Sequence, residues 1–303
     1  MRALVTGATG FIGRRLLESI DDPVVLSRNP ERSKAMLDGA SLYRWDPTEG
    51  PPPLEALEGV EAVFHLAGDP VAGGRWTDEK KRRVRDSRVV GTQNLVRAIA
   101  DSRNKPRVLV SASAIGYYGS RGDEVLSESS SPGSDFLADV CVGWERAAQG
   151  ARELGVRVVN PRIGIVLGQR GGALSQMLTP FRLGLGGRLG HGRQWMSWIH
   201  LKDVVGLLLL AATQESIVGP MNVVSPAPVT NREFTQTLAG VLHRPAVFPV
   251  PAIALRIMIG GFSEVLLGSQ RVLPVVAQSA DYPFEYASLR AALLAAVEEE
   301  TPA

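Results

Sequence analysis

Three glycines near the start of the chain have the spacing of a dinucleotide-binding loop. Gly7, Gly10 and Gly13 lie in the run TGATGFIG, between an apolar segment at 2–6 and a helical pattern at 11–20. Glycine permits the tight turn, lets backbone N–H groups approach a pyrophosphate, and allows the helix to pack closely on the strand. Because strand, loop and helix follow in the required order, the pattern predicts cofactor contacts from Gly7, Thr9, Gly10, Phe11, Ile12 and Gly13.

The residues at the end of the second predicted strand indicate which dinucleotide is bound. At this place an acidic side chain would accept hydrogen bonds from the adenine ribose of NAD. The chain has Ser27 and Arg28 instead. Because a guanidinium pairs with a 2′-phosphate and a carboxylate repels it, these residues favour NADP(H). An exposed loop arginine is the alternative interpretation of Arg28.

Two further segments are expected at the same ligand. Leu66, Ala67 and Gly68 follow the fourth predicted strand, at the carboxyl edge where doubly wound sheets bind ligands. Arg88 lies in a long predicted helix, close before Gly91, from which it could reach the phosphates or ribose of the cofactor. A tight strand exit and a solvated arginine are the corresponding structural alternatives.

The elements that must position these residues alternate along the chain. Apolar runs predict strands at 2–6, 24–26, 41–45, 62–66, 107–111, 156–160 and 221–224. Helical periodicity predicts helices at 11–20, 77–103, 135–154, 204–212 and 231–242. Continuous apolar strands joined by helices are typical of a parallel sheet that is covered on both faces. We therefore predict an α/β fold with a doubly wound, Rossmann-type parallel sheet.

Glycines and prolines after Pro161 predict a smaller C-terminal lobe. Five glycines fall between residues 184 and 192, and prolines recur at 245, 249 and 251. The helix at 204–212 and the strand at 221–224 fit the main sheet, so the two lobes are expected to interleave. We predict an NADP(H)-binding Rossmann domain at 1–165, completed by about 198–228, and a substrate lobe at 166–197 and 229–303.

Three motifs in order resemble the extended short-chain dehydrogenase/reductases, a group of epimerases, dehydratases and related reductases. They are TGATGFIG at 6–13, FHLAG at 64–68 and VVGTQNL at 89–95. Segments 144–148, 180–187, 198–203 and 222–234 are similar to an atypical, epimerase-like subfamily with a C-terminal domain of unknown function. The resemblance implies NADP(H) contacts at the glycine loop, Ser27, Arg28, Leu66, Ala67 and Arg88, and one near Val166.

The chain departs from this family at its catalytic pair. Ordinary members use a Tyr as proton donor or acceptor, with a Lys four residues later and a Ser at the end of the preceding strand. Ser113 matches that Ser, but Leu137 and Cys141 stand where the Tyr and Lys would be. Neither side chain can replace them, since Leu does not ionise and Cys lacks the charge and reach of Lys.

Substitutes for the missing pair are present in the neighbouring segments. Tyr117 or Tyr118 could deliver a proton from the loop over the nicotinamide, helped by Ser113, although packing aromatics are the favoured interpretation of both. Glu145 and Arg162 either line the cleft or form a surface ion pair. His200 is expected to be a core histidine, and Cys141, if buried, to be inert.

Composition limits the remaining choices. With 33 basic and 31 acidic residues and a net charge of +2, the chain offers no general field for nucleic acid or a membrane. Its single cysteine excludes an intramolecular disulfide, and the fold begins too early for a signal peptide, so we expect a cytoplasmic protein. A homodimer is an open option.

Two functions remain open. The first is an NADP(H)-dependent oxidoreductase or epimerase/dehydratase-type enzyme, which acts on a small or nucleotide-linked substrate held between the lobes. The second is a non-catalytic NADP(H)-binding protein that senses redox state or regulates a partner. The absent Tyr and Lys favour the second, and the retained cleft segments favour the first.

Overall fold

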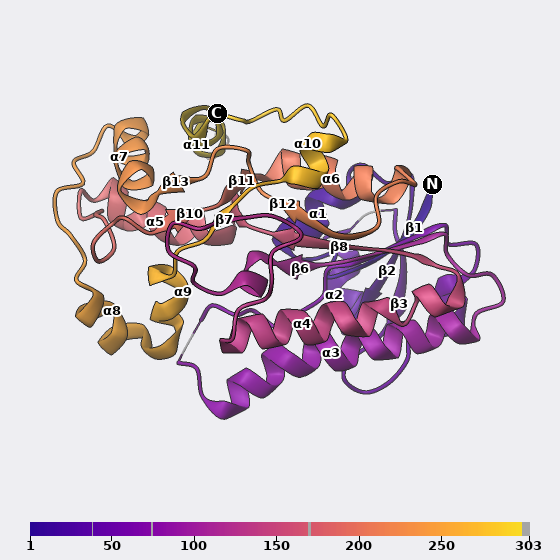
Figure 1. The fold of residues 1–303 in the computed structure, drawn as a ribbon. Helices are drawn as coiled ribbons and strands as arrows, with labels where there is room; N and C mark the ends of the chain where they lie inside the picture. The colour runs from indigo at the N-terminus through magenta and orange to yellow at the C-terminus, as the bar shows by residue number, and fades with distance from the viewer. Residues whose placement is uncertain (38, 74, 169–170, 299–303) are drawn as a thin grey trace.

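The central sheet carries the predicted doubly wound order. The computed structural model describes residues 1–37, 39–73, 75–168 and 171–298. The strands lie in the order β3-β2-β1-β4-β5-β8-β12, and each neighbouring pair is parallel (Figure 1). This order confirms the predicted Rossmann-type α/β fold. The strands span β1 (Arg2–Thr6), β2 (Asp22–Ser27), β3 (Ser41–Arg44), β4 (Ala62–His65), β5 (Val108–Ser111), β8 (Arg157–Ile163) and β12 (Gly219–Val223).

Helices cover both faces of this sheet. Figure 1 shows α3 and α4 lying side by side beneath it, with α1 and α6 above. Because successive side chains of a strand point to opposite faces, Leu4 packs with the α3–α4 layer and Val5 with the α1–α6 layer. Both faces are therefore apolar. The helices span α1 (Phe11–Leu17), α2 (Pro30–Lys34), α3 (Asp78–Asp101), α4 (Phe136–Gln149) and α6 (Leu201–Thr213), and a short 3-10 helix, η1 (Leu54–Leu57), precedes β4.

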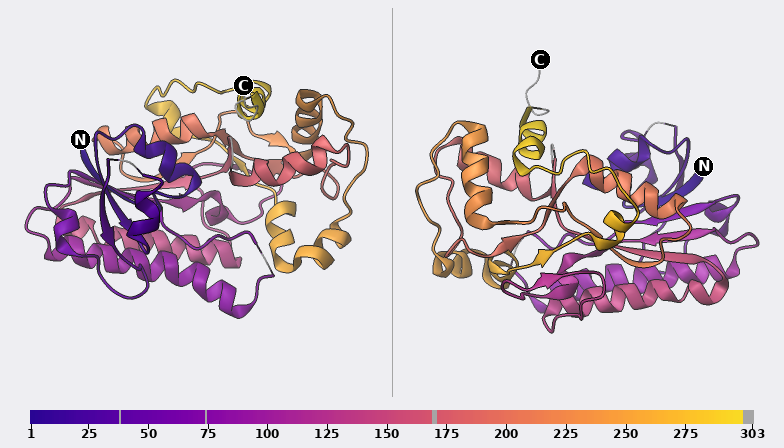
Figure 2. Two further views of the ribbon diagram at one scale, coloured as in Figure 1. Left: turned by 180° about the vertical axis from the view of Figure 1, so that it is seen from behind. Right: turned by 45° about the horizontal axis from the view of Figure 1, so that its top comes forward.

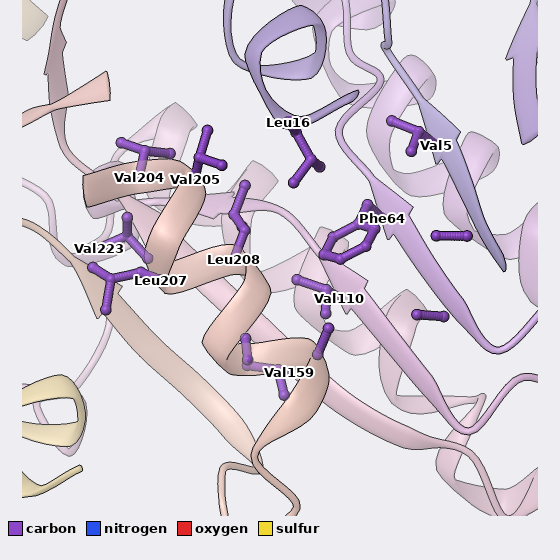
Figure 3. Close-up of a cluster of buried hydrophobic side chains, with 14 of the residues drawn as sticks. Val5, Leu16, Phe64, Val110, Val159, Val204, Val205, Leu207, Leu208 and Val223 are labelled. Carbon is purple, nitrogen blue, oxygen red and sulfur yellow. The ribbon is translucent and has the colours of Figure 1, made fainter. Parts of the chain in front are cut away.

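Helix α6 provides the densest part of the core. Its side chains Leu207 and Leu208 meet Val110 and Val159 of the sheet, with Phe64 and Leu16 beside them (Figure 3). All six side chains are fully buried. Burial of each such side chain stabilises the fold by about 1.5–3 kcal/mol, which explains why this strongly apolar helix lies against the sheet.

The C-terminal lobe forms a separate hydrophobic cluster beside the carboxyl end of the sheet (Figure 2). Trp198 and Phe234 are its largest fully buried side chains. The cluster brings together α5 (Gly172–Arg182), α7 (Asn231–Leu242) and α11 (Leu289–Glu298), with the short strands β9 (Ile165–Leu167), β10 (Trp195–Met196), β11 (Trp198–His200) and β13 (Val229–Thr230). The lobe also holds α8 (Ala252–Ile259), η4 (Gly260–Phe262) and α9 (Ser263–Leu267).

The chain passes between the lobes several times. It leaves the sheet after β8, builds α5, returns through α6 and β12, and then forms α7 to α11. The final crossing includes β14 (Arg271–Val272), which pairs with β7 (Val125–Leu126), and α10 (Val275–Ser279). Asp203 in the first turn of α6 accepts hydrogen bonds from the backbone N–H groups of Glu285 (2.9 Å) and Tyr286 (3.0 Å), which fastens the C-terminal segment.

Several predicted boundaries are wrong by a few residues. Thr77 and Asp135 are N-caps whose side chains accept from the third helical N–H, so α3 and α4 begin one residue later than predicted. Helix α4 ends at Gln149, and η3 (Arg152–Leu154) follows it. Strand β8 continues beyond Asn160 through Pro161. The missing proline N–H is tolerated because β5 ends before it and β6 (Ser113–Ala114) begins after it.

Candidate functional site

The glycine loop joins β1 to α1 in a conformation that requires two of its glycines. Gly7 has a φ of +71°, and a Cβ there would lie 2.8 Å from the backbone of Leu66. A Cβ on Gly13 would overlap the carbonyl of Gly7. Gly10 is different, because it is exposed and caps α1 without a side-chain hydrogen bond. The first N–H groups of α1 are thus left for an anionic ligand.

A cavity of about 480 Å³ extends from this loop along the carboxyl edge of the sheet. One end is formed by the glycine loop and the other by α4, with Ser113 between them. The cavity brings together nine of the predicted site residues: Gly7, Gly10, Phe11, Ile12, Gly13, Leu66, Arg88, Ser113 and Val166. The predicted residues Thr9, Ser27, Arg28, Ala67, Gly68, Tyr117 and Tyr118 are not part of its lining.

Ser27 and Arg28 lie at the carboxyl end of β2, the next strand along the edge. The Ser27 hydroxyl is 2.6 Å from the hydroxyl of Ser33 and accepts from the N–H of Asn29, which fixes the turn into α2. Arg28 is exposed, and within the described residues its guanidinium forms no ion pair. Its charge therefore remains free for a phosphate.

A buried polar chain holds the Leu66–Ala67 turn against the glycine loop. The Thr6 hydroxyl accepts from the N–H groups of Leu66 (3.1 Å) and Ala67 (3.0 Å) and lies 2.8 Å from Nδ1 of His65. Nε2 of His65 lies 3.0 Å from the hydroxyl of Thr92, which donates to the carbonyl of Arg88. Burial, followed by the charge of Arg88, lowers the pKa of His65 to about 4. A neutral ring protonated at Nε2 satisfies every member of the chain.

Arg88 brings a half-buried positive charge to the cavity wall. One guanidinium nitrogen donates to the carbonyls of Asp69 (2.9 Å) and Val84 (3.0 Å), and the group lies 5.1 Å from the ring centre of Trp144. Burial lowers the pKa of Arg88. Lys80 binds the carboxylate of Asp69 at 2.7 Å, so this carboxylate does not occupy the guanidinium of Arg88. The remaining guanidinium donors of Arg88 are therefore left for a ligand.

Ser113 is held from behind by a buried ion pair. Its hydroxyl donates to Oε1 of Glu145 at 2.7 Å, and the same carboxylate binds Nε (2.8 Å) and a terminal nitrogen (2.9 Å) of Arg162. The side chains of Glu145 and Arg162 are 13% and 3% exposed. The pair is therefore neither a surface ion pair nor part of the cavity lining. Because the Ser113 proton is used by Glu145, its oxygen faces the cavity as an acceptor.

The two tyrosines of η2 (Ile115–Tyr118) pack against the guanidinium of Arg162. Tyr118 is fully buried, donates to Oδ1 of Asn222 at 2.7 Å, and accepts from Arg162 at 3.0 Å. Burial raises its pKa. The structure does not support Tyr118 as a proton donor, because its hydroxyl is used and away from the cavity. Tyr117 lies flat on Arg162, with 3.4 Å from the guanidinium to the ring centre, and is half-buried.

The α4 end of the cavity is apolar. Leu137 and Cys141 line it, as do Val140 and Trp144. Burial, followed by the charge of Glu145, raises the pKa of Cys141 to about 11, so the thiol stays protonated at neutral pH. The sequence reasoning missed Trp144. Its spacing of four plus three residues after Leu137 places it on the same face of a helix, and this signal could have identified it.

His200 lies outside this cavity. His200 is buried in the core as predicted: Nδ1 accepts from the N–H of Lys202, and the ring packs on Tyr286 with 3.9 Å between centres. Its Nε2 is buried without a hydrogen-bond partner among the described residues, so only one of the two ring nitrogens is satisfied. Among the described residues, no cluster of His, Cys, Asp or Glu is arranged to hold a metal ion. Across the same residues, no helix is long and apolar enough to cross a membrane.

Residues 3–224 match the family model of the NAD dependent epimerase/dehydratase family. The chain belongs to this family. Residues 250–296 match a domain of unknown function, DUF1731, which confirms the predicted subfamily. Both matches agree with the site, because the family segment contains the glycine loop, Ser113 and α4, whereas the second segment lies in the C-terminal lobe.

Relatives match over nearly their full length. An epimerase family protein of Mycobacterium bovis is 40% identical over 295 residues, covering 95% of each chain. The chloroplastic SDR39U1 homologue of Arabidopsis thaliana is 40% identical over 98% of this chain and 87% of its own. The crystal structure of the human epimerase family protein SDR39U1 with NADPH has a TM-score of 0.87 and 33% identity, covering 98% of this chain and 99% of the human one.

Proposed function

We propose that this family member binds NADP(H) in the cavity between the glycine loop and α4. The observation that carries the proposal is the continuous cavity from Gly7 and Gly10 to Ser113. The uncapped start of α1 fits a pyrophosphate, and exposed Arg28 fits a 2′-phosphate. The human relative that was crystallised with NADPH supports the same choice of cofactor.

The residues around the cavity have separate parts in holding the cofactor. Gly7, Thr9, Gly10, Phe11, Ile12 and Gly13 would bind the pyrophosphate, and Ser27 and Arg28 the adenosine phosphate. Leu66, Ala67, Gly68 and Arg88 would hold the ribose or phosphates, and Val166 the nicotinamide side. When bound, NADP(H) supplies a hydride or accepts one.

We further propose that the protein is an oxidoreductase or an epimerase/dehydratase-type enzyme with Ser113 as its polar contact to substrate. Glu145 orients the Ser113 hydroxyl, so the free lone pairs of Ser113 can accept from a substrate hydroxyl. Tyr117 remains the candidate proton donor from the loop. Within the described residues its hydroxyl forms no hydrogen bond, whereas the hydroxyl of Tyr118 donates to Asn222. The substrate would be a small or nucleotide-linked molecule in the cytoplasm.

A non-catalytic redox sensor is the second candidate, and one observation favours it. The two positions that carry the proton-transfer pair in ordinary members hold Leu137 and a protonated Cys141, which form an apolar wall. Such a wall can exclude water from the cofactor without taking part in a proton transfer. A regulatory protein would need only the cofactor half of the site.

A crystal structure of the protein, incubated with NADPH and a cell extract before crystallisation, tests both parts of the proposal. We expect density for the cofactor from Gly10 to Ser113, and a second molecule with a hydroxyl at Ser113. Cofactor density with water alone at Ser113 would favour the sensor. Cofactor density elsewhere, or none at saturating NADPH, would refute the site.

A further inference from the structure

A second cavity lies in the C-terminal lobe and shares no lining residue with the first. Its volume is about 250 Å³, and it is lined by Arg188, Arg232, Thr235, Gln236, Ala246 and Val247. Arg232, Thr235 and Gln236 belong to the first two turns of α7, and Arg188 comes from the loop before β10. The lining therefore has a polar part of four residues, which includes two positive charges, and an apolar part of two residues.

The two arginines carry charges that the described chain does not neutralise. Arg188 donates to the carbonyl of His191 at 3.3 Å, and Arg232 has no side-chain hydrogen bond or ion pair among the described residues. Both side chains pass close to Gly192, where an added Cβ would lie 3.2 Å from Arg188 and 3.5 Å from Arg232. Both side chains thus start from backbone close to Gly192 and line the same cavity, where an anion would be attracted by both positive charges.

Thr235 contributes a buried hydroxyl without a partner. The residue is 3% exposed, and its Oγ1 forms no hydrogen bond in the described structure. A hydroxyl in this position normally donates back along the helix, as Thr237 does to the carbonyl of Glu233 at 2.8 Å. Leaving such a group unpaired costs about 1–3 kcal/mol, and Thr235 is one of the residues that line the cavity.

The N-terminus of α7 does not itself provide the binding groups. Its first N–H groups already donate, from Asn231 to Gln194 and from Arg232 to Gly192, both at 2.8 Å, and from Glu233 to Thr230 at 3.3 Å. The Glu233 carboxylate is held by the backbone N–H of Thr230 at 2.7 Å. A ligand in the cavity would therefore have to be bound by the side chains that line it, and not by the backbone N–H groups of α7.

We propose that this cavity binds the phosphate group of a small organic phosphate ester. The planar guanidinium groups of Arg188 and Arg232 match phosphate oxygens, and the Thr235 hydroxyl and Gln236 amide add neutral donors. The apolar wall of Ala246 and Val247 accommodates the organic part, since Val247 is 69% exposed. This site is independent of the NADP(H) cleft.

Titration calorimetry of the full chain with phenyl phosphate, at fixed ionic strength, tests the proposal. We expect saturable binding that Arg188→Gln and Arg232→Gln each weaken at least about tenfold, and that Thr235→Val weakens about fivefold. Arg193→Gln is the matched control, because Arg193 is exposed in the same loop and does not line the cavity. Its affinity for phenyl phosphate, and the NADPH affinity of every variant, should not change.

Three outcomes would overturn the proposal. The first is no saturable binding of phenyl phosphate, and the second is equal weakening by Arg193→Gln and Arg232→Gln, which would indicate a general charge effect. The third is equal affinity for inorganic phosphate and phenyl phosphate, which would remove the organic ester as the ligand.

Discussion

The glycine-loop end and the α4 end of the cleft offer a ligand different chemistry. At the first end, backbone N–H groups and the exposed Arg28 are held ready for phosphates. At the second, Leu137, Cys141 and Trp144 form an apolar wall, and Ser113 contributes one oriented oxygen. The comparison teaches that the two ends can vary separately in this fold, because different elements provide the phosphate-facing groups and the groups around Ser113.

The largest expected effect concerns Glu145, which holds Ser113 and Arg162 behind the α4 end of the cavity. Glu145→Gln leaves the buried guanidinium of Arg162 without its counter-charge, so the free energy of unfolding should fall by about 3–5 kcal/mol. Urea denaturation measures it. Glu285→Gln is the control, since its ion pair with Lys202 is exposed and its loss should cost at most about 1 kcal/mol. Equal losses in the two variants would contradict the structural role of the buried pair.

Protonation of His65 should destabilise the turn next to the glycine loop. Its folded-state pKa of about 4 lies below the ordinary 6.5, so the unfolded chain takes up a proton that the folded chain excludes. The stabilisation is present above about pH 6.5 and declines as the pH falls to about 4, by about 3 kcal/mol. The unfolding free energy measured across this range should fall less steeply in His65→Gln.

His200→Gln is the control for His65→Gln in the same experiment, because His200 lies outside the cavity. The pKa of His200 is also lowered to about 4, first by burial, so this variant should flatten the pH dependence as well. Only His65→Gln should weaken NADPH binding, because only His65 supports the Leu66–Ala67 turn through Thr6. Unchanged NADPH affinity in His65→Gln would break the proposed link.

Gly10→Val should remove cofactor binding and leave the fold intact. Gly10 has a φ of −76°, which valine can adopt, but its Cβ would lie 3.0 Å from the carbonyl oxygen of Gly7, so the loop must shift by a few tenths of an ångström to admit it. The side chain would fill the place of the pyrophosphate, so we expect NADPH affinity to fall at least about 100-fold, or about 2.7 kcal/mol. Titration calorimetry with NADPH provides the measurement. Gly50→Val, in open space, is the control. Normal binding by Gly10→Val would show that the loop is only a turn.

The sequence was sufficient for the sheet and for the cofactor end. Apolar runs predicted the seven strands of the path β3-β2-β1-β4-β5-β8-β12, since burial on both faces leaves a strong local signal, but not the two-residue strand β6 that pairs with β8. The glycine loop is equally local, because its strand, turn and helix are contiguous. Strand β8 was predicted to end at Asn160, because the tolerance for Pro161 depends on where the neighbouring strands break.

The chemical end was harder to predict because its contacts join residues far apart in the sequence. Ser113 contacts Glu145 across 32 positions, and Tyr118 contacts Asn222 across 104. Sequence patterns identified these residues as candidates but could not distinguish a residue that lines the cavity from one that lies behind it. Tyr118 and Glu145 were candidates for contact with a ligand, with a packing aromatic and a surface ion pair as the alternatives, and the structure places both behind the cavity lining.

The affinity of the chain for NADPH and NADH tests the central claim most directly. Arg28 should make NADPH bind at least about tenfold tighter than NADH, or about 1.4 kcal/mol, and Arg28→Asp should reverse the order. Titration calorimetry on both proteins gives the two ratios, with Arg32→Asp in neighbouring α2 as the control. Equal affinities for the two cofactors in the unchanged chain would contradict the account.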